Sequence, residues 1–206
     1  MGIRASFYLF RKLTADLSEW IRYRIHLYKN EPYFGRILAA SGMSHRRTPM
    51  QKLMELEVKN HTFFRILEIG SWAGASALLW AKAIKDSGIG GIVFCVDPWR
   101  PYMNQKNIGN IKIGKYQKIE RALGEGKIYK LFLHNIKAAG YSDIIKPLRF
   151  SSDEILPVLR GGEFNLVYID GDHSYSQVIK DLENCRRLLV GGVLYAEMIW
   201  NCRETR

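Results

Sequence analysis

The chain has 206 residues, of which 47% are hydrophobic, so it can bury a core and is not globally disordered. Lys and Arg outnumber Asp and Glu by 31 to 20, and the net charge of +11 favours anionic partners. The 3 cysteines have no CxxC spacing, which argues against a zinc site and indicates free thiols in a reducing compartment such as the cytoplasm.

A basic helical extension is predicted at the N-terminal end, over residues 1–47. Apolar side chains recur near helical spacing between residues 5 and 28, which predicts an amphipathic helix. Such a helix packs against the domain or a second subunit, giving a homo-oligomer, or lies as a peripheral contact on an anionic membrane surface. No run approaches the roughly 20 apolar residues of a membrane span.

Residues 48–206 are predicted to form one domain in which strands and helices alternate. A helix begins at Thr48, with Pro49 in its first turn and Gln51 completing a capping box. Strands are predicted over residues 65–69, 92–96, 147–150, 165–169 and 193–196, the last after a Gly-Gly turn. Further helices are predicted over residues 75–85, from a capping box at 151–154 to residue 159, and from a capping box at 174–177 to residue 189. This alternation predicts an α/β fold with a Rossmann-like, doubly wound, mainly parallel sheet, whose ligands bind beyond the carboxyl ends of the strands.

Residues 100–145 form a basic insertion between the second and third strands. The segment is partly helical, and the window 99–149 holds 11 basic and 3 acidic side chains. We expect it to cover the ligand side of the sheet as a lid, with tyrosines at positions 102, 116, 129 and 141.

The first motif follows the first strand and has the spacing Glu-x-Gly-x-x-x-Gly from Glu68 to Gly74. A glycine turn between strand and helix lets a ligand approach the backbone, and the helix N-terminus offers free N–H groups. The turn is not a dinucleotide fingerprint, because Trp72 stands where that motif requires a glycine. A dehydrogenase is therefore disfavoured.

Two further segments end the second and third strands. Asp97 is placed to accept hydrogen bonds from both hydroxyls of a ribose, or it caps the loop before Pro98. Trp99 packs against a cofactor or acceptor, or it walls the core. Ser151 and Ser152 follow the third strand and contact a ligand there, or they cap the next helix.

The fourth motif, at residues 168–175, carries two carboxylates and an imidazole at the end of the fourth strand. Asp170 could bind a hard cation or orient a hydroxyl group. His173 is a candidate general base, because an imidazole titrates near neutral pH. For Asp172 the capping role is favoured.

These four segments together resemble methyltransferase family 24, a branch of the class I S-adenosylmethionine-dependent methyltransferases. The branch includes cephalosporin-hydroxylase-like proteins and macrolide-sugar O-methyltransferases. The resemblance covers roughly residues 48–198. Its most specific piece is the run IDGDHSY at residues 169–175, which is followed by a helix and Gly-Gly.

The resemblance implies a cofactor site and a catalytic base. In the family, the glycines of the first motif contact the methionine half of S-adenosylmethionine, the acidic residue helps to hold its ammonium group, and the position after the third strand touches the adenine. The implied cofactor-binding residues are Glu68, Gly70, Ser71, Gly74, Ser76, Asp97, Trp99, Ser151, Ser152 and Asp170. His173 is implied as the base, with Asp170 as its catalytic partner, and residues 100–145 as the acceptor-side insertion.

A magnesium site is implied for the metal-dependent members of the family. There Asp170 corresponds to one ligand and Glu197 to the first member of an acidic pair after the fifth strand. In this chain Met198 stands at the second position of the pair, and a thioether does not suit magnesium. The metal is therefore held by Asp170 and Glu197 with water, or it is lost.

We expect an S-adenosylmethionine-dependent O-methyltransferase acting on a hydroxyl of a sugar or other small metabolite. If the basic surface binds this acceptor, the acceptor is anionic. The basic surface keeps an RNA methyltransferase open, although nucleic acid is the less favoured partner because no RNA-binding module is visible. The chain ends ten residues after Ala196, without the last hairpin usual in such domains, so a truncated, non-catalytic cofactor-binding relic also stays open.

Overall fold

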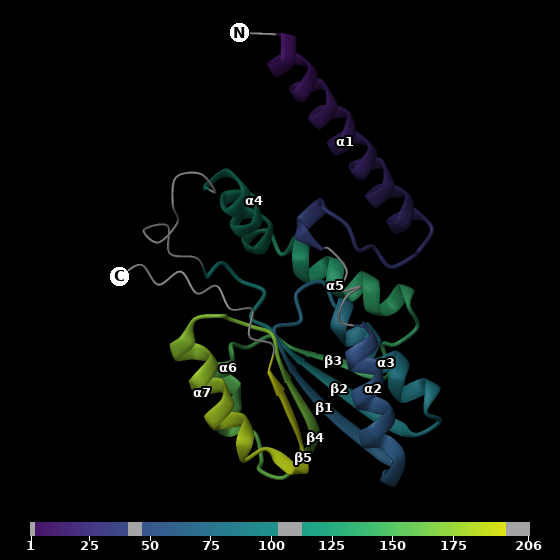
Figure 1. Ribbon diagram of the computed structural model, residues 1–206, viewed down its shortest axis with the longest axis vertical. Helices are drawn as coiled ribbons and strands as arrows, with labels where there is room; N and C mark the ends of the chain where they lie inside the picture. The colour runs from purple at the N-terminus through teal and green to yellow at the C-terminus, as the bar shows by residue number, and fades with distance from the viewer. Residues whose placement is uncertain (1–2, 41–46, 103–112, 197–206) are drawn as a thin grey trace.

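A sheet of five parallel strands forms the centre of the computed structural model, which describes residues 3–40, 47–102 and 113–196 (Figure 1). The strands are β1 (Phe63–Ile69), β2 (Gly90–Val96), β3 (Ile145–Leu148), β4 (Phe164–Ile169) and β5 (Leu189–Ala196). Their order across the sheet is β3-β2-β1-β4-β5, and each neighbouring pair is parallel. The predicted α/β, Rossmann-like architecture is confirmed.

Helices cover both faces of this sheet (Figure 1). One face carries α2 (Arg47–Glu57) and α3 (Ala75–Asp86), and the other carries α6 (Ser152–Ile155), the short helix η4 (Leu156–Val158) and α7 (Tyr175–Arg186). Successive side chains of β1 supply the two cores in turn: Ile66 packs in the cluster that contains Trp80, and Leu67 packs in the cluster that contains Cys185. Because both faces are buried, the central strands β1, β2 and β4 are largely apolar on both sides.

Several boundaries differ from the prediction. β3 lies two residues earlier, so Pro147 is inside a strand; β3 is an edge strand, where the N–H that proline lacks is not needed. α7 ends at Arg186 rather than at residue 189, and β5 begins at Leu189 rather than at 193. The glycine pair is therefore not a turn before the strand. Gly191, with φ +56°, lies in a register irregularity within β5.

The capping boxes have different outcomes. The one at residues 151–154 is confirmed, with both the N–H and the hydroxyl of Ser151 donating to the Glu154 carboxylate at 2.7 Å. The one at 174–177 is wrong, because the Ser174 side chain makes no cap and Gln177 donates to Ser152 and to Asp181 instead. α2 begins at Arg47, so residue 48 lies inside its first turn and is not the cap.

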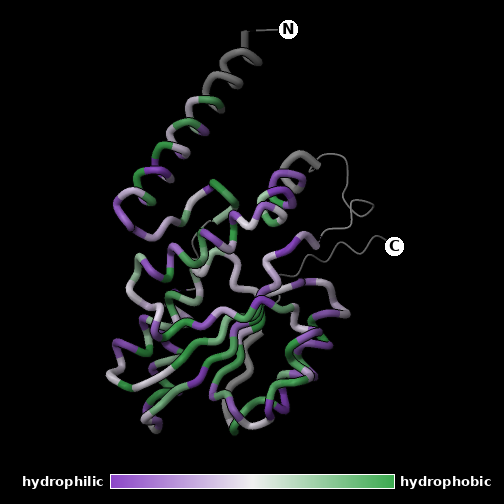
Figure 2. Tube along the Cα trace, turned by 180° about the vertical axis from the view of Figure 1, so that it is seen from behind, coloured by the Kyte–Doolittle hydropathy of each residue, from purple (hydrophilic) through white to green (hydrophobic). Residues whose placement is uncertain are grey.

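The predicted N-terminal helix is present as α1 (Ile3–Tyr28), which projects away from the sheet (Figures 1 and 2). Along its outer side Leu13, Leu17 and Trp20 are more than half exposed. Among the described residues, no helix combines the length and the apolar character needed to cross a membrane. Contact of α1 with a second subunit or with a membrane surface stays a prediction.

Candidate functional site

The parallel strands bring the predicted site residues to one edge of the sheet. Ile69 of β1 pairs with Val96 of β2 and with Ile169 of β4, and Val96 pairs with Leu148 of β3. The loops that follow these four strands therefore begin side by side. The loop after β1 contains the first motif, and the loops after β2, β3 and β4 contain Asp97, Ser151 and Asp170 in that order. This is the arrangement expected for an α/β ligand site.

The turn after β1 has an unusual backbone. Gly70, Trp72 and Gly74 all have positive φ, at +87°, +47° and +86°. A Cβ at Gly70 would overlap the carbonyl of Asp170 and would lie 2.6 Å from the Cα of Gly171. The glycine is thus required by the loop after β4, whereas the sequence motif attributes it to the approach of a ligand.

Asp97 holds this turn from the neighbouring strand. Its carboxylate accepts the N–H of Trp72 at 2.9 Å and the N–H of Trp99 at 2.8 Å, and the indole N–H of Trp99 donates to the carbonyl of Trp72 at 2.8 Å. Burial raises the pKa of Asp97, and these N–H groups oppose the rise. Asp97 therefore caps its loop, one of the two roles considered for it, and is 8% exposed.

Trp99 lies in the wall of the core. Its ring is 1% exposed and packs against Phe132 and Tyr129 of α5 (Lys127–Ala138), with centroids 4.6 and 4.9 Å away. This packing fits the second of its two predicted roles. It also places α5 beside the carboxyl end of β2.

Glu68 is a buried acid with an unused oxygen. Its Oε2 accepts the hydroxyl of Ser71 at 2.6 Å and the thiol of Cys95 at 3.4 Å, while Oε1 has no hydrogen-bond partner among the described residues. Burial raises the pKa of Glu68 to about 7, and the charge of Asp170 adds to the rise. Ser71 and Ser76, both buried, oppose it. A cationic group beside Oε1 would supply the missing partner and favour the ionised form.

Asp170 and His173 face each other at the end of β4. Asp170 Oδ1 lies 3.9 Å from His173 Nε2, and the hydroxyl of Tyr168 donates to Asp170 Oδ2 at 3.4 Å. The imidazole is 39% exposed and the carboxylate 14% exposed. Asp172 instead accepts the N–H of Ser174 at 2.8 Å, so it has the capping role that the sequence favours.

The two serines after β3 are engaged in local contacts. Ser151 caps α6, and Ser152 accepts a hydrogen bond from Gln177 of α7 at 3.2 Å. Both are only partly buried at the site edge. Arg100, in the loop after β2, pairs with Glu154 at 3.1 Å and links the neighbouring loops.

No group of three His, Cys, Asp or Glu residues able to hold a metal ion is found within residues 3–40, 47–102 and 113–196. The second predicted magnesium ligand, Glu197, and the neighbouring Met198 lie outside the described residues. Asp170 is thus the only predicted ligand that can be placed.

The three predicted lid tyrosines whose side chains the structure describes do not gather in one place; the side chain of Tyr116 lies outside the described part. Tyr129 packs against Trp99 with its ring tilted by 47°, and the Arg149 guanidinium lies over the Tyr129 ring, 4.4 Å from its centroid. Tyr102 is 62% exposed after β2. Tyr141 precedes β3, at the opposite edge of the sheet, and lies under the Lys85 ammonium.

Sequence reasoning missed two residues that shape the site, Trp72 and Asn135. Asn135 is fully buried on α5 and donates to the carbonyl of Ala73 in the turn after β1 at 2.9 Å. A signal was present: Asn135 continues the apolar stripe that Ile128, Leu131 and Phe132 begin at helical spacing, and a polar residue on such a stripe needs a buried partner.

Comparison with known proteins agrees with this architecture. Residues 67–196 match methyltransferase family 24, described as a methyltransferase domain. Cofactor-bound Rv0187 from MTB is 21% identical over 93% of this chain and 70% of its own, with a TM-score of 0.50. The O-methyltransferase NovP is 17% identical over 77% of this chain and 67% of its own, with a TM-score of 0.59. At these identities the two structures are similar in fold. No curated protein sequence matches the chain.

Proposed function

The chain belongs to methyltransferase family 24 and is an S-adenosylmethionine-dependent methyltransferase, and from this premise we propose that it methylates a hydroxyl oxygen of a small-molecule acceptor such as a sugar. The observation that carries the proposal is the gap between Asp170 and His173 at the end of β4. The similarity in fold to the O-methyltransferase NovP is consistent with it.

The residues at the carboxyl edge fit the cofactor. S-adenosylmethionine supplies a methyl group bonded to a positively charged sulfur, and it carries an ammonium group and a ribose. Glu68 offers a buried oxygen without a hydrogen-bond partner, which suits the ammonium. The turn of residues 70–74, with Ser71, Ser76 and the N-terminus of α3, would hold the methionine half. Asp97, and Ser151 with Ser152, would flank the ribose and the adenine, and Asp170 would close the site.

The gap between Asp170 Oδ1 and His173 Nε2, at 3.9 Å, is too long for a hydrogen bond between them. The space between these two atoms can hold an oxygen atom about 2.8 Å from both of them, and 2.8 Å is an ordinary hydrogen-bond distance. An acceptor hydroxyl at that point has a single proton to donate. A hydrogen bond to Asp170 would orient it before the reaction, and it would turn to give that proton to Nε2 of His173 as it reacts. The bound cofactor would supply its methyl group to this oxygen and keep the electron pair of the methyl–sulfur bond on its sulfur.

Asp170 has a second effect on this step. The imidazolium that forms is positively charged, and the carboxylate beside it stabilises that charge. Tyr168 holds the carboxylate by its other oxygen.

The test compares His173→Gln with Asp172→Asn, a neighbouring change in a residue that only caps the loop. Cofactor affinity is measured by calorimetry, and methyl transfer is measured with a panel of sugars and other small hydroxyl compounds. We expect His173→Gln to bind S-adenosylmethionine normally and to lose turnover by about 100-fold or more, the usual contribution of a general base. Equal turnover in His173→Gln and the unmodified enzyme would refute the assignment of the base.

A further inference from the structure

A single buried amide joins the N-terminal segment to the turn after β1. Oδ1 of Asn135 accepts the N–H of Tyr33 at 2.8 Å, and its Nδ2 donates to the carbonyls of Tyr33 at 3.1 Å and of Ala73 at 2.9 Å. The side chain is 0% exposed, so each of these bonds is made away from water. Asn135 thus ties together three segments that are distant in the sequence.

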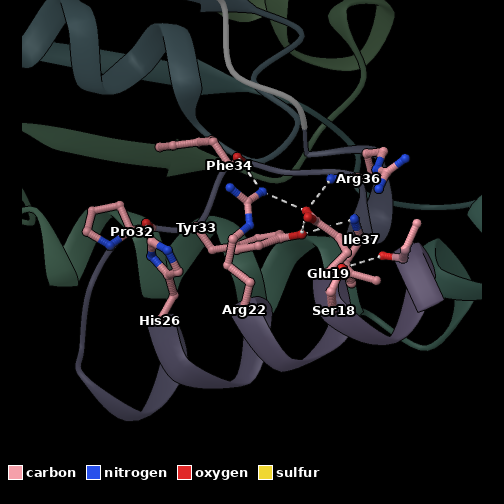
Figure 3. Close-up of polar contacts among 10 residues, drawn as sticks. Ser18, Glu19, Arg22, His26, Pro32, Tyr33, Phe34, Arg36 and Ile37 are labelled. Carbon is pink, nitrogen blue, oxygen red and sulfur yellow. Dashed lines mark hydrogen bonds and ion pairs between the residues drawn. The ribbon is translucent and has the colours of Figure 1, made fainter.

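The Tyr33 side chain carries the connection to α1 (Figure 3). Its hydroxyl donates to Glu19 at 2.6 Å and accepts the N–H of Ile37 at 3.1 Å. Glu19 also accepts hydrogen bonds from the Arg22 guanidinium at 2.6 Å and from the N–H of Arg36 at 2.9 Å. The hydrogen bonds from Tyr33 and Arg22 lower the pKa of Glu19 to about 2, so the carboxylate is ionised at neutral pH.

Close packing accompanies these bonds on both sides of Tyr33. A Cβ at Gly35 would overlap the side-chain ends of Glu19, Arg22 and Tyr33, so a larger residue there would displace this hydrogen-bonded group. On the domain side, Tyr33 and Ala73 belong to one buried apolar cluster, against which Trp72 packs. The N-terminal segment therefore forms part of the surroundings of the turn.

The turn needs such support because of its backbone. Trp72 has a left-handed conformation, which is strained for a non-glycine residue and persists only where the surrounding structure imposes it. Asp97 and Trp99 hold Trp72 from β2, and Asn135 holds the next carbonyl from α5. Without Asn135, the carbonyl of Ala73, which precedes Gly74 and the N-terminus of α3, loses its hydrogen bond to α5.

We infer that Asn135 is a positioning residue for the cofactor-binding turn, and that residues 33–40 belong to the cofactor site of the domain and are not part of a separate extension. The inference rests on the proposed role of residues 70–74 in binding S-adenosylmethionine. It assigns to the N-terminal segment a function in cofactor affinity, although the segment precedes the residues matched to the family.

Asn165 provides a matched control. Its Oδ1 also accepts a backbone N–H, that of Arg65, at 2.8 Å, but it does so at the amino ends of β4 and β1, at the opposite edge of the sheet. Asn135→Ala and Asn165→Ala therefore each remove an asparagine side chain that forms a hydrogen bond with the backbone. Only Asn135 lies next to the turn after β1.

The experiment measures the dissociation constant of S-adenosylmethionine by calorimetry and the thermal midpoint of unfolding for both variants. We expect Asn135→Ala to weaken cofactor binding about tenfold, as for the loss of one buried hydrogen bond, and Asn165→Ala to change it less than about twofold. In kinetics, Asn135→Ala should raise KM for the cofactor more than it lowers kcat. An unchanged dissociation constant in a folded Asn135→Ala protein, whatever its thermal midpoint, overturns the inference.

A second variant covers the case in which Asn135→Ala does not fold. Tyr33→Phe removes only the hydroxyl that bonds Glu19 and leaves the backbone contacts with Asn135 in place. We expect it to weaken cofactor binding about threefold, because the segment is held less firmly. An affinity equal to that of the unmodified protein counts against the inference. If the unmodified protein itself does not bind the cofactor, the proposed function fails, and this outcome is distinct from failure of the inference.

Discussion

Glu68 is a carboxyl group whose pKa the fold raises into the neutral range. Its pKa is about 7 in the folded protein and 4.5 ordinarily, because burial disfavours the charged form. Between these two values the folded protein holds a proton that the unfolded chain releases. Folding stability is therefore greatest, as far as Glu68 is concerned, below pH 4.5, and it falls as the pH rises toward 7.

Glu68→Gln should remove this dependence, because an amide does not titrate. We expect the free energy of unfolding of the unmodified protein, relative to that of the variant, to fall by on the order of 3 kcal/mol between pH 4.5 and pH 7 and then to level off. Urea unfolding of both proteins at intervals between pH 4.5 and 8 provides the measurement. A difference that does not change with pH would show that Glu68 is ionised throughout.

Gly70 is constrained by the chain itself. Gly70→Ala would place a methyl group into the backbone of residues 170 and 171 at a positive φ, and we expect the free energy of unfolding to fall by about 3 kcal/mol or more. Gly140→Ala is the control, since Gly140 has φ +74° and open space around its Cβ. It should lose only about 1–2 kcal/mol, the cost of the left-handed backbone alone. Equal losses would mean that the loop after β4 moves aside freely.

At the scale of elements, Asp97 joins the loops that follow β1 and β2. Asp97→Asn keeps one acceptor but presents an N–H group to one of the two backbone donors, so the turn should loosen. We expect a loss of about 1–3 kcal/mol in cofactor binding free energy. Asp172→Asn, which alters a similar cap outside the turn, should leave affinity unchanged; calorimetry on both variants checks this. A loss shared by both would point to a general effect on folding.

Glu19 anchors α1 to the domain through Tyr33 and Arg36. Glu19→Gln should expose the backbone amides of the last turns of α1 to faster hydrogen exchange, because an amide accepts fewer and weaker hydrogen bonds than a carboxylate. Asp86→Asn, which breaks an exposed Lys82–Asp86 pair on α3, should have little effect on exchange in α1. Exchange followed by mass spectrometry, residue range by residue range, distinguishes the two. Unchanged exchange in Glu19→Gln would contradict the anchoring role.

The regular elements could be predicted because each carries its own signal. Short, largely apolar runs located β1, β2 and β4, and the capping residues located α6. The errors occurred where partners far along the chain decide the outcome. Pro147 is accepted in β3 only because β3 is an edge strand, and Gln177 prefers Ser152 to the cap of its own helix. The residues around Pro147 do not show that β3 lies at the edge of the sheet, and those around Gln177 do not show that Ser152 lies nearby.

At the scale of the whole molecule, the positions of the site residues could be predicted because parallel strands end at one edge. Their contacts could not. The sequence motif suggests that Gly70 and Asp97 serve a ligand, yet both also hold the protein's own backbone, through Asp170 and Trp72. The contribution of Tyr33 was missed because its contact with Asn135 spans 102 residues, a separation at which no sequence pattern operates.

That separation has a consequence for the order of events during synthesis. A ribosome adds about 5–20 residues per second, so roughly 5–20 s pass between the addition of Tyr33 and the addition of Asn135. During this interval the backbone N–H and carbonyl of Tyr33 lack the Asn135 side chain that they bind in the folded protein. The segment that packs over α1 therefore lacks its contact with α5. Helix α1 therefore reaches its final place only after Asn135 has been added, 102 residues after Tyr33.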